Sequence, residues 1–324
     1  MNDAQLILIL NRDLPTGQSP STLRRSSDLI VVRRGVRVEA KAWAAASPLA
    51  RFRARVDAVV ATRSSPLLLR ESAAVIWRLP LVESPPQVID VQACGADGSR
   101  RRAGIAEHRS SIPPLVDTIG GYRVSSFAQT VFDLSRFASF RRAVVAADHA
   151  LRRVGSDGAP LLRRDELREL LEALPLGAKG HRKSAAVIAF ADPRAESPLE
   201  SISRVGMHLA GIPAPVLQQR IPLGDGRNAY LDFAWPALGA VGEADGRFKY
   251  TDPAFLQGRT AEHAVYDEKR REDAIRSITR GFARWSWDDA YAVTPMLAEL
   301  AKAGVKPGTS IVQGNLLERV PRNA

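Results

Sequence analysis

Three acidic residues in the last third of the chain have the types and spacing that divalent-metal chemistry requires. Asp232 lies near the end of one apolar segment, and Glu243 and Asp245 lie in the next, after a short turn. If that turn centres between Ala237 and Leu238, Asp232 lies opposite Glu243 in an antiparallel hairpin, with Cβ atoms roughly 5 Å apart. Period-two alternation along the strand then places Asp245 on the same face as Glu243.

Carboxylates gathered on one patch repel one another unless a cation lies between them. Their hard oxygen atoms suit Mg²⁺ or Mn²⁺, which lower the pKa of a bound water and neutralise charge on a phosphodiester. We therefore expect a hydrolytic site with Asp232 and Glu243 as metal ligands. Glu200 follows Ser197 by three residues, and this spacing leaves two interpretations open: a supporting catalytic group, or only the glutamate of a helix capping box.

The elements that position these carboxylates follow from caps, turns and hydrophobic periodicity. From residue 196 onward we expect a helix, three strands, a long helix and a fourth strand, at 197–209, 216–221, 229–235, 240–245, 262–280 and 282–287. The long helix crosses over and returns the fourth strand beside the sheet, with Gly281 as its C′ glycine. Trp285 and Trp287 are expected to pack in the core, and Asp288 to begin a last helix. The basic run Lys269 to Arg271 is expected to lie largely on an exposed face paired with neighbouring acids.

The ordered set of these motifs resembles a known nuclease superfamily. Asp232 followed by Glu243-Ala244-Asp245-Gly246 resembles the PD-(D/E)XK nucleases. More narrowly, the chain is similar to the DUF559 domain, a relative of very-short-patch-repair endonucleases, in SPLE (197–200), LDFAWP (231–236), EADG (243–246), EKRRED (268–273) and RWSWD (284–288). The resemblance covers about residues 196–295 and implies a restriction-endonuclease-like fold, a divalent metal and DNA as substrate. Asp245 stands where the superfamily has lysine, and Lys249 is the candidate replacement.

Charge is distributed unevenly along the chain. The net charge is +11, yet residues 196–324 hold 16 basic and 16 acidic residues, so the whole excess lies in residues 1–195. A basic part joined to a neutral part that carries carboxylates favours DNA binding by the first and chemistry by the second. An arginine-rich composition inherited from a GC-rich genome is the alternative left open.

The first 45 residues have the pattern of a small winged helix-turn-helix module. Ser19-Pro20 marks a helix start, and 29–33 and 36–38 have the pattern of a β-hairpin. The DNA-contacting candidates are Arg24 and Arg25 on the recognition helix and Arg33, Arg34 and Arg37 on the wing. The alternative is an arginine-rich surface hairpin.

Residues 46–155 are expected to form a mixed α/β domain, and 156–195 a helical connector. Helices are predicted at 51–62, 71–78, 127–134, 140–152, 165–174 and 185–190, and a strand at 87–93. His108 and His149 have no second ligand at metal spacing and are expected to be structural or solvated. Segments 71–80, 124–126 and 130–134 resemble the AbiEi-type antitoxin family. That resemblance implies a DNA-binding N-terminal module, transcriptional autoregulation and a cognate toxin as partner.

These expectations combine into a multidomain α+β or α/β protein with domains 1–45, 46–155, 156–195 and 196–324. The leading hypothesis is an enzyme, a Mg²⁺-dependent endonuclease delivered to DNA by its basic N-terminal part. The alternative is an antitoxin-like regulator with a catalytically inactive nuclease-like domain. One cysteine, Cys94, and no apolar run of membrane-spanning length favour the cytoplasm and no membrane partner. The oligomeric state is left open by the sequence.

Overall fold

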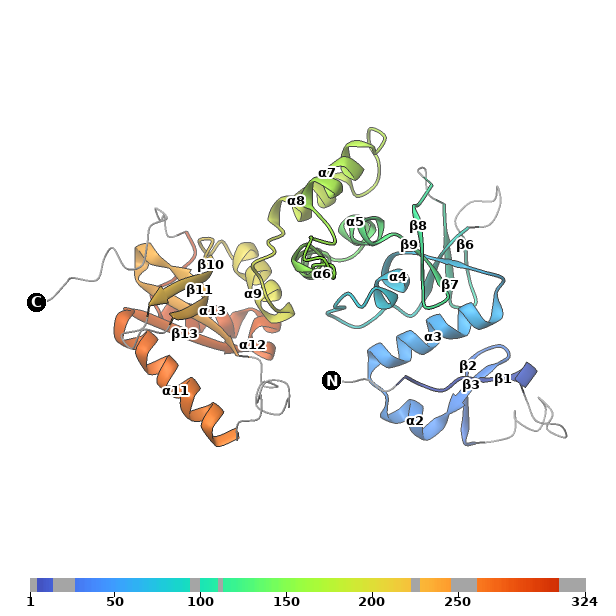
Figure 1. The fold of residues 1–324 in the computed structure, drawn as a ribbon, viewed down its shortest axis with the longest axis horizontal. Helices are drawn as coiled ribbons and strands as arrows, with labels where there is room; N and C mark the ends of the chain where they lie inside the picture. Colours follow the sequence, from blue (N-terminus) through green and yellow to red (C-terminus); the bar gives the residue numbers. More distant parts are fainter. Residues whose placement is uncertain are drawn as a thin grey trace, which may run out of the picture. The chain divides into compact units, whose positions relative to one another are not determined.

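The computed structural model describes residues 5–13, 27–93, 100–109, 113–222, 228–245 and 261–308, with only the backbone described for 261–268. The chain divides into two compact units, Met1–Ala191 and Asp192–Ala324 (Figure 1). Both units combine helices with sheets, so the predicted mixture of α and β structure is confirmed. Within this described part of the chain, no helix is long and apolar enough to cross a membrane.

A small antiparallel sheet of order β1-β3-β2 begins the first unit. The elements in this region are β1 (Ile9–Leu10), η1 (Asn11–Asp13), β2 (Leu29–Arg33), β3 (Val36–Glu39), α2 (Ala40–Ala45) and α3 (Pro48–Thr62). The β2–β3 hairpin turns at Gly35, whose φ of +84° lies in the left-handed region that glycine adopts without strain. The predicted hairpin is therefore present, whereas the predicted helix with Arg24 and Arg25 lies outside the described residues.

A mixed six-stranded sheet follows, with the order β6-β7-β5-β4-β9-β8. Its elements are β4 (Leu67–Leu68), α4 (Arg70–Ile76), β5 (Ile89–Gln92), β6 (Arg100–Arg102), β7 (Ile105–His108), β8 (Val116–Ile119) and β9 (Tyr122–Ser125). Helix α3 lies between the two sheets (Figure 1): Phe52 and Val56 enter the core of the larger sheet, and Ala54 packs against the smaller one. Arg100–Arg102 pairs antiparallel with β7 and forms the edge strand β6 of this sheet.

Four helices complete the first unit: α5 (Phe127–Phe137), α6 (Phe140–Arg152), α7 (Arg164–Glu172) and α8 (His181–Phe190). Ser126 and Ser139 cap α5 and α6 by accepting hydrogen bonds from backbone N–H groups of the first turn. Helix α8 begins at His181, four residues before the predicted start. Gly180 is the N-cap residue of α8 and packs so closely against the Arg136 carbonyl oxygen that a Cβ there would lie 2.6 Å from it.

The second unit has the predicted order α-β-β-β-α-β. Its elements are α9 (Pro198–Leu209), β10 (Val216–Pro222), β11 (Asn228–Trp235), η2 (Pro236–Leu238), β12 (Ala240–Asp245), α11 (Ala261–Ile278), β13 (Gly281–Ser286), α12 (Trp287–Ala292) and α13 (Thr294–Lys302). The sheet order is β10-β11-β12-β13, with β12 and β13 parallel and the other pairs antiparallel. Ile275 of α11 packs on Val241 on one face, and Trp285 donates to Ser203 of α9 on the other.

Two predictions for the end of this unit are wrong. Gly281 does not close α11 as a left-handed C′ residue but begins β13, where an added Cβ would lie 2.1 Å from the Ala303 carbonyl oxygen. Trp287 does not join Trp285 in the core. The strand ends at Ser286, which caps α12 in a capping box, and Trp287 in the first turn is 39% exposed, whereas Trp285 is 1% exposed.

Candidate active site

The β11–β12 hairpin brings Asp232 beside β12. The strands pair as Phe233↔Gly242 and Trp235↔Ala240, which is the register predicted from the turn position. Asp232 lies one residue beyond this paired stretch, and its Oδ2 accepts a hydrogen bond from the Ala244 N–H at 2.9 Å. This hydrogen bond to the backbone of β12 holds the Asp232 side chain next to the strand that carries Glu243.

Glu243 and Asp245 lie on the face of the sheet that α11 covers. Val241, two residues before Glu243 on β12, packs against this helix, and alternation places all three side chains on one face. Glu243 is 5% exposed, whereas the Asp245 side chain is 32% exposed. Burial of a carboxylate at Glu243 is costly without a positive partner, so the groups around it decide its role.

Glu200 and Asp232 are linked by hydrogen bonds from one glutamine side chain. The Ser197 hydroxyl accepts from the Glu200 N–H, so Ser197 caps α9 as predicted. The Glu200 carboxylate accepts from the Ser197 hydroxyl at 2.8 Å and from the Glu196 N–H at 2.9 Å, rather than from the Ser197 N–H that a capping box would use. Gln218 Nε2 donates to Glu200 Oε2 at 3.1 Å and to Asp232 Oδ1 at 3.4 Å. Burial raises the pKa of Glu200, and the neighbouring charge of Asp232 raises it further.

Gln218 is a site residue that the sequence did not indicate. It belongs to β10, opposite Asp232 and between the pairs Leu217↔Phe233 and Gln219↔Leu231. Its φ of +50° is unusual for a residue with a side chain and costs on the order of 1–3 kcal/mol. The strained position is the one whose amide bridges two carboxylates. A glutamine in an apolar strand carries no motif, so only the register of β10 against β11 identifies it.

Two arginines supply positive charge on this face. Arg271 of α11 donates through one terminal nitrogen to both carboxylate oxygens of Glu243, at 3.3 and 3.4 Å, and to the Tyr230 carbonyl oxygen at 2.8 Å. Arg284 is paired with Glu243 in the parallel β12–β13 ladder, and its Nε lies 4.0 Å from Asp245 Oδ2. Its terminal nitrogen donates to Glu272 at 2.8 Å.

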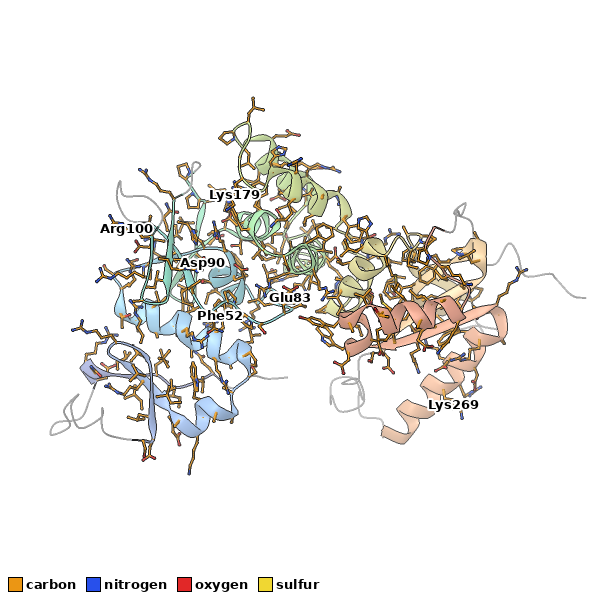
Figure 2. All side chains as sticks on the ribbon, turned by 180° about the vertical axis from the view of Figure 1, so that it is seen from behind. Phe52, Glu83, Asp90, Arg100, Lys179 and Lys269 are labelled. Carbon is orange, nitrogen blue, oxygen red and sulfur yellow. The ribbon has the colours of Figure 1, made fainter. Side chains whose placement is uncertain are left out.

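The basic run on α11 divides between two environments. Lys269, labelled in Figure 2, and Arg270 are exposed as predicted, whereas Arg271 is partly buried because it reaches Glu243. Lys249, the predicted replacement for the missing motif lysine, lies outside the described residues. Among the residues that are described, Arg271 and Arg284 are therefore the positive groups that contact the strand carrying Glu243 and Asp245.

Two carboxylates of this region have the chemistry of magnesium ligands. Asp232 and Glu243 carry hard oxygen atoms on adjacent strands and are the residues that could hold such an ion, since Mg²⁺ is commonly bound through one or two carboxylates. Across the described ranges, no group of three or more His, Cys, Asp and Glu side chains is arranged to hold a metal. Asp245, 32% exposed beside Arg284, and Glu200, within its helix cap, then remain candidates for supporting roles.

The arginines predicted to contact DNA from the first unit differ in exposure. Arg34 is exposed at the hairpin turn, and Arg33 is partly buried against Thr62 and the Ala103 carbonyl oxygen. Arg37 is only 4% exposed and donates to Asn11 at 2.6 Å, so it holds β3 to the chain after β1. Of the three arginines predicted on this hairpin, Arg34 is thus exposed, Arg33 is partly exposed and Arg37 is buried.

His108 is a structural residue, as expected. Its Nε2 lies 2.5 Å from Asp90 Oδ1, and both side chains are largely buried between β5 and β7. Arg70 approaches the same ring nitrogen at 3.3 Å. The sequence did not predict this partner, which is the carboxylate of Asp90 on the neighbouring parallel strand β5.

Comparison with known proteins adds two relatives, both from Mycobacterium tuberculosis. The chain is 28% identical over 185 residues to the uncharacterized protein MT2308 of strain CDC 1551 / Oshkosh, and equally to the uncharacterized protein Rv2248 of strain ATCC 25618 / H37Rv. The match covers 53% of this chain and 65% of each relative. No protein-family model matches the chain.

Proposed function

We propose that this protein is a metal-dependent nuclease that hydrolyses phosphodiester bonds of DNA. The observation that carries the proposal is the hydrogen bond from the Ala244 N–H to Asp232, which holds one carboxylate beside the strand of a second, buried carboxylate, Glu243. The resemblance to PD-(D/E)XK and DUF559 nucleases supports it, because Asp232 and Glu243 match the acidic positions of that motif. The order of strands and helices in the second unit is compatible with a restriction-endonuclease-like fold.

In this proposal Asp232 and Glu243 hold a Mg²⁺ or Mn²⁺ ion. Such a metal activates a water and stabilises negative charge on the phosphate. Gln218 orients the Asp232 carboxylate by donating to Oδ1, while the Ala244 N–H fixes Oδ2. Glu200 carries a pKa raised by burial and by Asp232, and it accepts or holds a proton at its carboxylate more readily than an exposed glutamate.

The charge of the missing motif lysine is supplied by arginine in this proposal. Arg271 contacts Glu243, and Arg284 lies beside Asp245. A guanidinium stays protonated near neutral pH, so these residues orient and neutralise a phosphate rather than take a proton from water. Lys249 remains a further candidate, and the basic first unit binds DNA through Arg24, Arg25, Arg33 and Arg34.

The test is cleavage of supercoiled and mismatch-bearing DNA by the full chain with Mg²⁺ or Mn²⁺. We expect nicking by the wild type, loss of nicking in chelator, and at least a hundredfold loss in Glu243→Gln. Glu299→Gln is the matched control, because Glu299 is on α13 and pairs with Lys302 on the surface. Equal nicking by Glu243→Gln and the wild type, or cleavage that persists without metal, would refute the site.

A second function is favoured by a different observation. Asp245 occupies the lysine position, and the contacts of Arg271 with both oxygens of Glu243 provide a positive partner without any metal. Both features suit an AbiEi-like regulator whose nuclease-like domain is inactive and whose partner is a cognate toxin. This function predicts salt-dependent binding of the full chain to its own upstream DNA, unchanged by Glu243→Gln, with no cleavage under any metal.

A further inference from the structure

A basic pocket in the first unit lies outside the proposed active site. Its volume is about 400 Å³, and it is lined by Arg33, Arg63, Arg100, Arg102, Ala103, Ile105 and Glu107. Among the described lining residues, four are arginine and one is glutamate. A cavity of this size accommodates a small ligand or a segment of a nucleic-acid backbone.

The pocket is assembled from three separate parts of the chain. Arg33 ends β2 of the small sheet, and Arg63 directly follows α3. Arg100, labelled in Figure 2, and Arg102 belong to β6, the edge strand of the six-stranded sheet. Because Arg100 and Arg102 are two residues apart on a strand, both side chains point to one face, while Arg101 between them points to the other.

The structure describes the contacts of two arginines of the pocket. Arg63 pairs with Glu107, the acid among the described lining residues, at 2.6 Å. Arg33 donates to two neutral oxygens, the Thr62 hydroxyl at 2.8 Å and the Ala103 carbonyl at 3.2 Å. Burial lowers the pKa of Arg33, and the nearby positive charge of Arg63 lowers it further.

We propose that this pocket binds a phosphate group, supplied by a DNA backbone or by a small phosphorylated molecule. Guanidinium groups match phosphate geometry with paired N–H donors, and four of them line this pocket. Arg33 is held in place before binding by Thr62 and Ala103, which lowers the entropy lost on complex formation. The proposal concerns the first unit and does not depend on nuclease activity in the second.

Charged side chains on an edge strand also have a simpler use, since they discourage pairing with other chains. In that role Arg101 and Arg102 are equivalent, because both are exposed on β6. Only a pocket makes them different, since Arg102 lines it and Arg101 does not. Arg101→Gln is therefore a control with the same strand and the same loss of charge as Arg102→Gln.

The experiment measures binding of pyrophosphate and of a short DNA duplex to the full chain, by calorimetry and fluorescence anisotropy. Loss of one charged hydrogen bond predicts roughly tenfold weaker binding by Arg102→Gln, and by Arg100→Gln as a second pocket variant. Arg101→Gln is expected to stay within about twofold of the wild type. Thermal unfolding of each variant verifies that the first unit stays folded.

The two ligands distinguish the source of the phosphate. Weaker pyrophosphate binding specific to Arg100→Gln and Arg102→Gln supports the pocket and identifies a small phosphorylated ligand. If the wild type ignores pyrophosphate but the pocket variants lose DNA affinity and about one unit of salt slope, the pocket is supported and the ligand is the DNA backbone. Equal effects of the pocket variants and Arg101→Gln on both ligands, or no effect at all, would overturn the proposal.

Discussion

Replacing Asp133 by asparagine is expected to remove a loss of stability that the wild type undergoes between about pH 4 and 6. Asp133 lies on α5, is 8% exposed and accepts a hydrogen bond from Gln129 at 2.9 Å. Burial raises its pKa to about 6, although Gln129 and the positive charges of Arg70, Arg136 and His108 favour the charged form. Asparagine keeps the shape and an oxygen acceptor for Gln129, but it does not titrate.

The size and sign of the effect follow from the two pKa values of Asp133. In the unfolded chain the carboxyl loses its proton near pH 3.8, and in the folded protein near pH 6. Between these values the folded state binds more protons, so stability falls as pH rises. A pKa shift of about two units corresponds to roughly 3 kcal/mol of folding free energy. The folded wild type bears this whole cost above about pH 6 and none of it below about pH 4.

Urea unfolding at half-unit intervals from pH 4 to 7 measures this difference. Limited proteolysis assigns the transition of the first unit, because two units need not unfold together. The stability of Asp133→Asn minus that of the wild type should rise by roughly 3 kcal/mol across the interval. Asp165→Asn, a change at an exposed carboxylate on α7 that pairs with Arg168, serves as the control. Parallel curves for the wild type and Asp133→Asn would show that the Asp133 carboxyl is not held in the folded state as argued.

Two further predictions concern the second unit. Gly281→Ala is expected to destabilise it by about 3 kcal/mol, at the upper end of overpacking costs, because the new Cβ meets the backbone of Ala303 rather than a movable side chain. Unfolding of the variant within 0.5 kcal/mol of the wild type, on the order of a neutral surface change, would contradict this contact. Asp232→Asn is expected to lower the pKa of Glu200 toward its ordinary value, since one negative neighbour is removed. Carboxyl NMR titration of the metal-free protein measures the change, and an unaltered titration of Glu200 would mean that the two carboxylates do not interact.

Short-range sequence patterns were sufficient to predict the positions of many helices and strands. Helix α6 spans Phe140–Arg152 and strand β12 spans Ala240–Asp245, both as predicted. Caps such as Ser197 act within one turn of the helix, and apolar alternation acts within one strand, so neither needs distant contacts. The placement of Asp232 near Glu243 was also predictable, because the connection between their strands is so short that it determines the register.

The same short-range patterns could not predict the contacts between different helices and strands. Gln218 bridges Glu200 and Asp232 only because β10 pairs with β11 in one particular register. Arg271 looked like one more cation of an exposed helix face, and its contact with Glu243 depends on how α11 crosses the sheet. The space that Gly281 must leave free is decided by Ala303, which comes from a later helix.

The sequence by itself thus determined the order of the elements in the second unit, the hairpin register and the carboxylates that the hairpin brings together, since these depend on interactions between residues close in the chain. The tertiary structure alone decided which cations meet those carboxylates. It also gathered Arg33, Arg63 and Arg100 from three separate segments into one pocket. The physical reason is that long-range side-chain contacts depend on the packing of whole elements, and no local propensity encodes that packing.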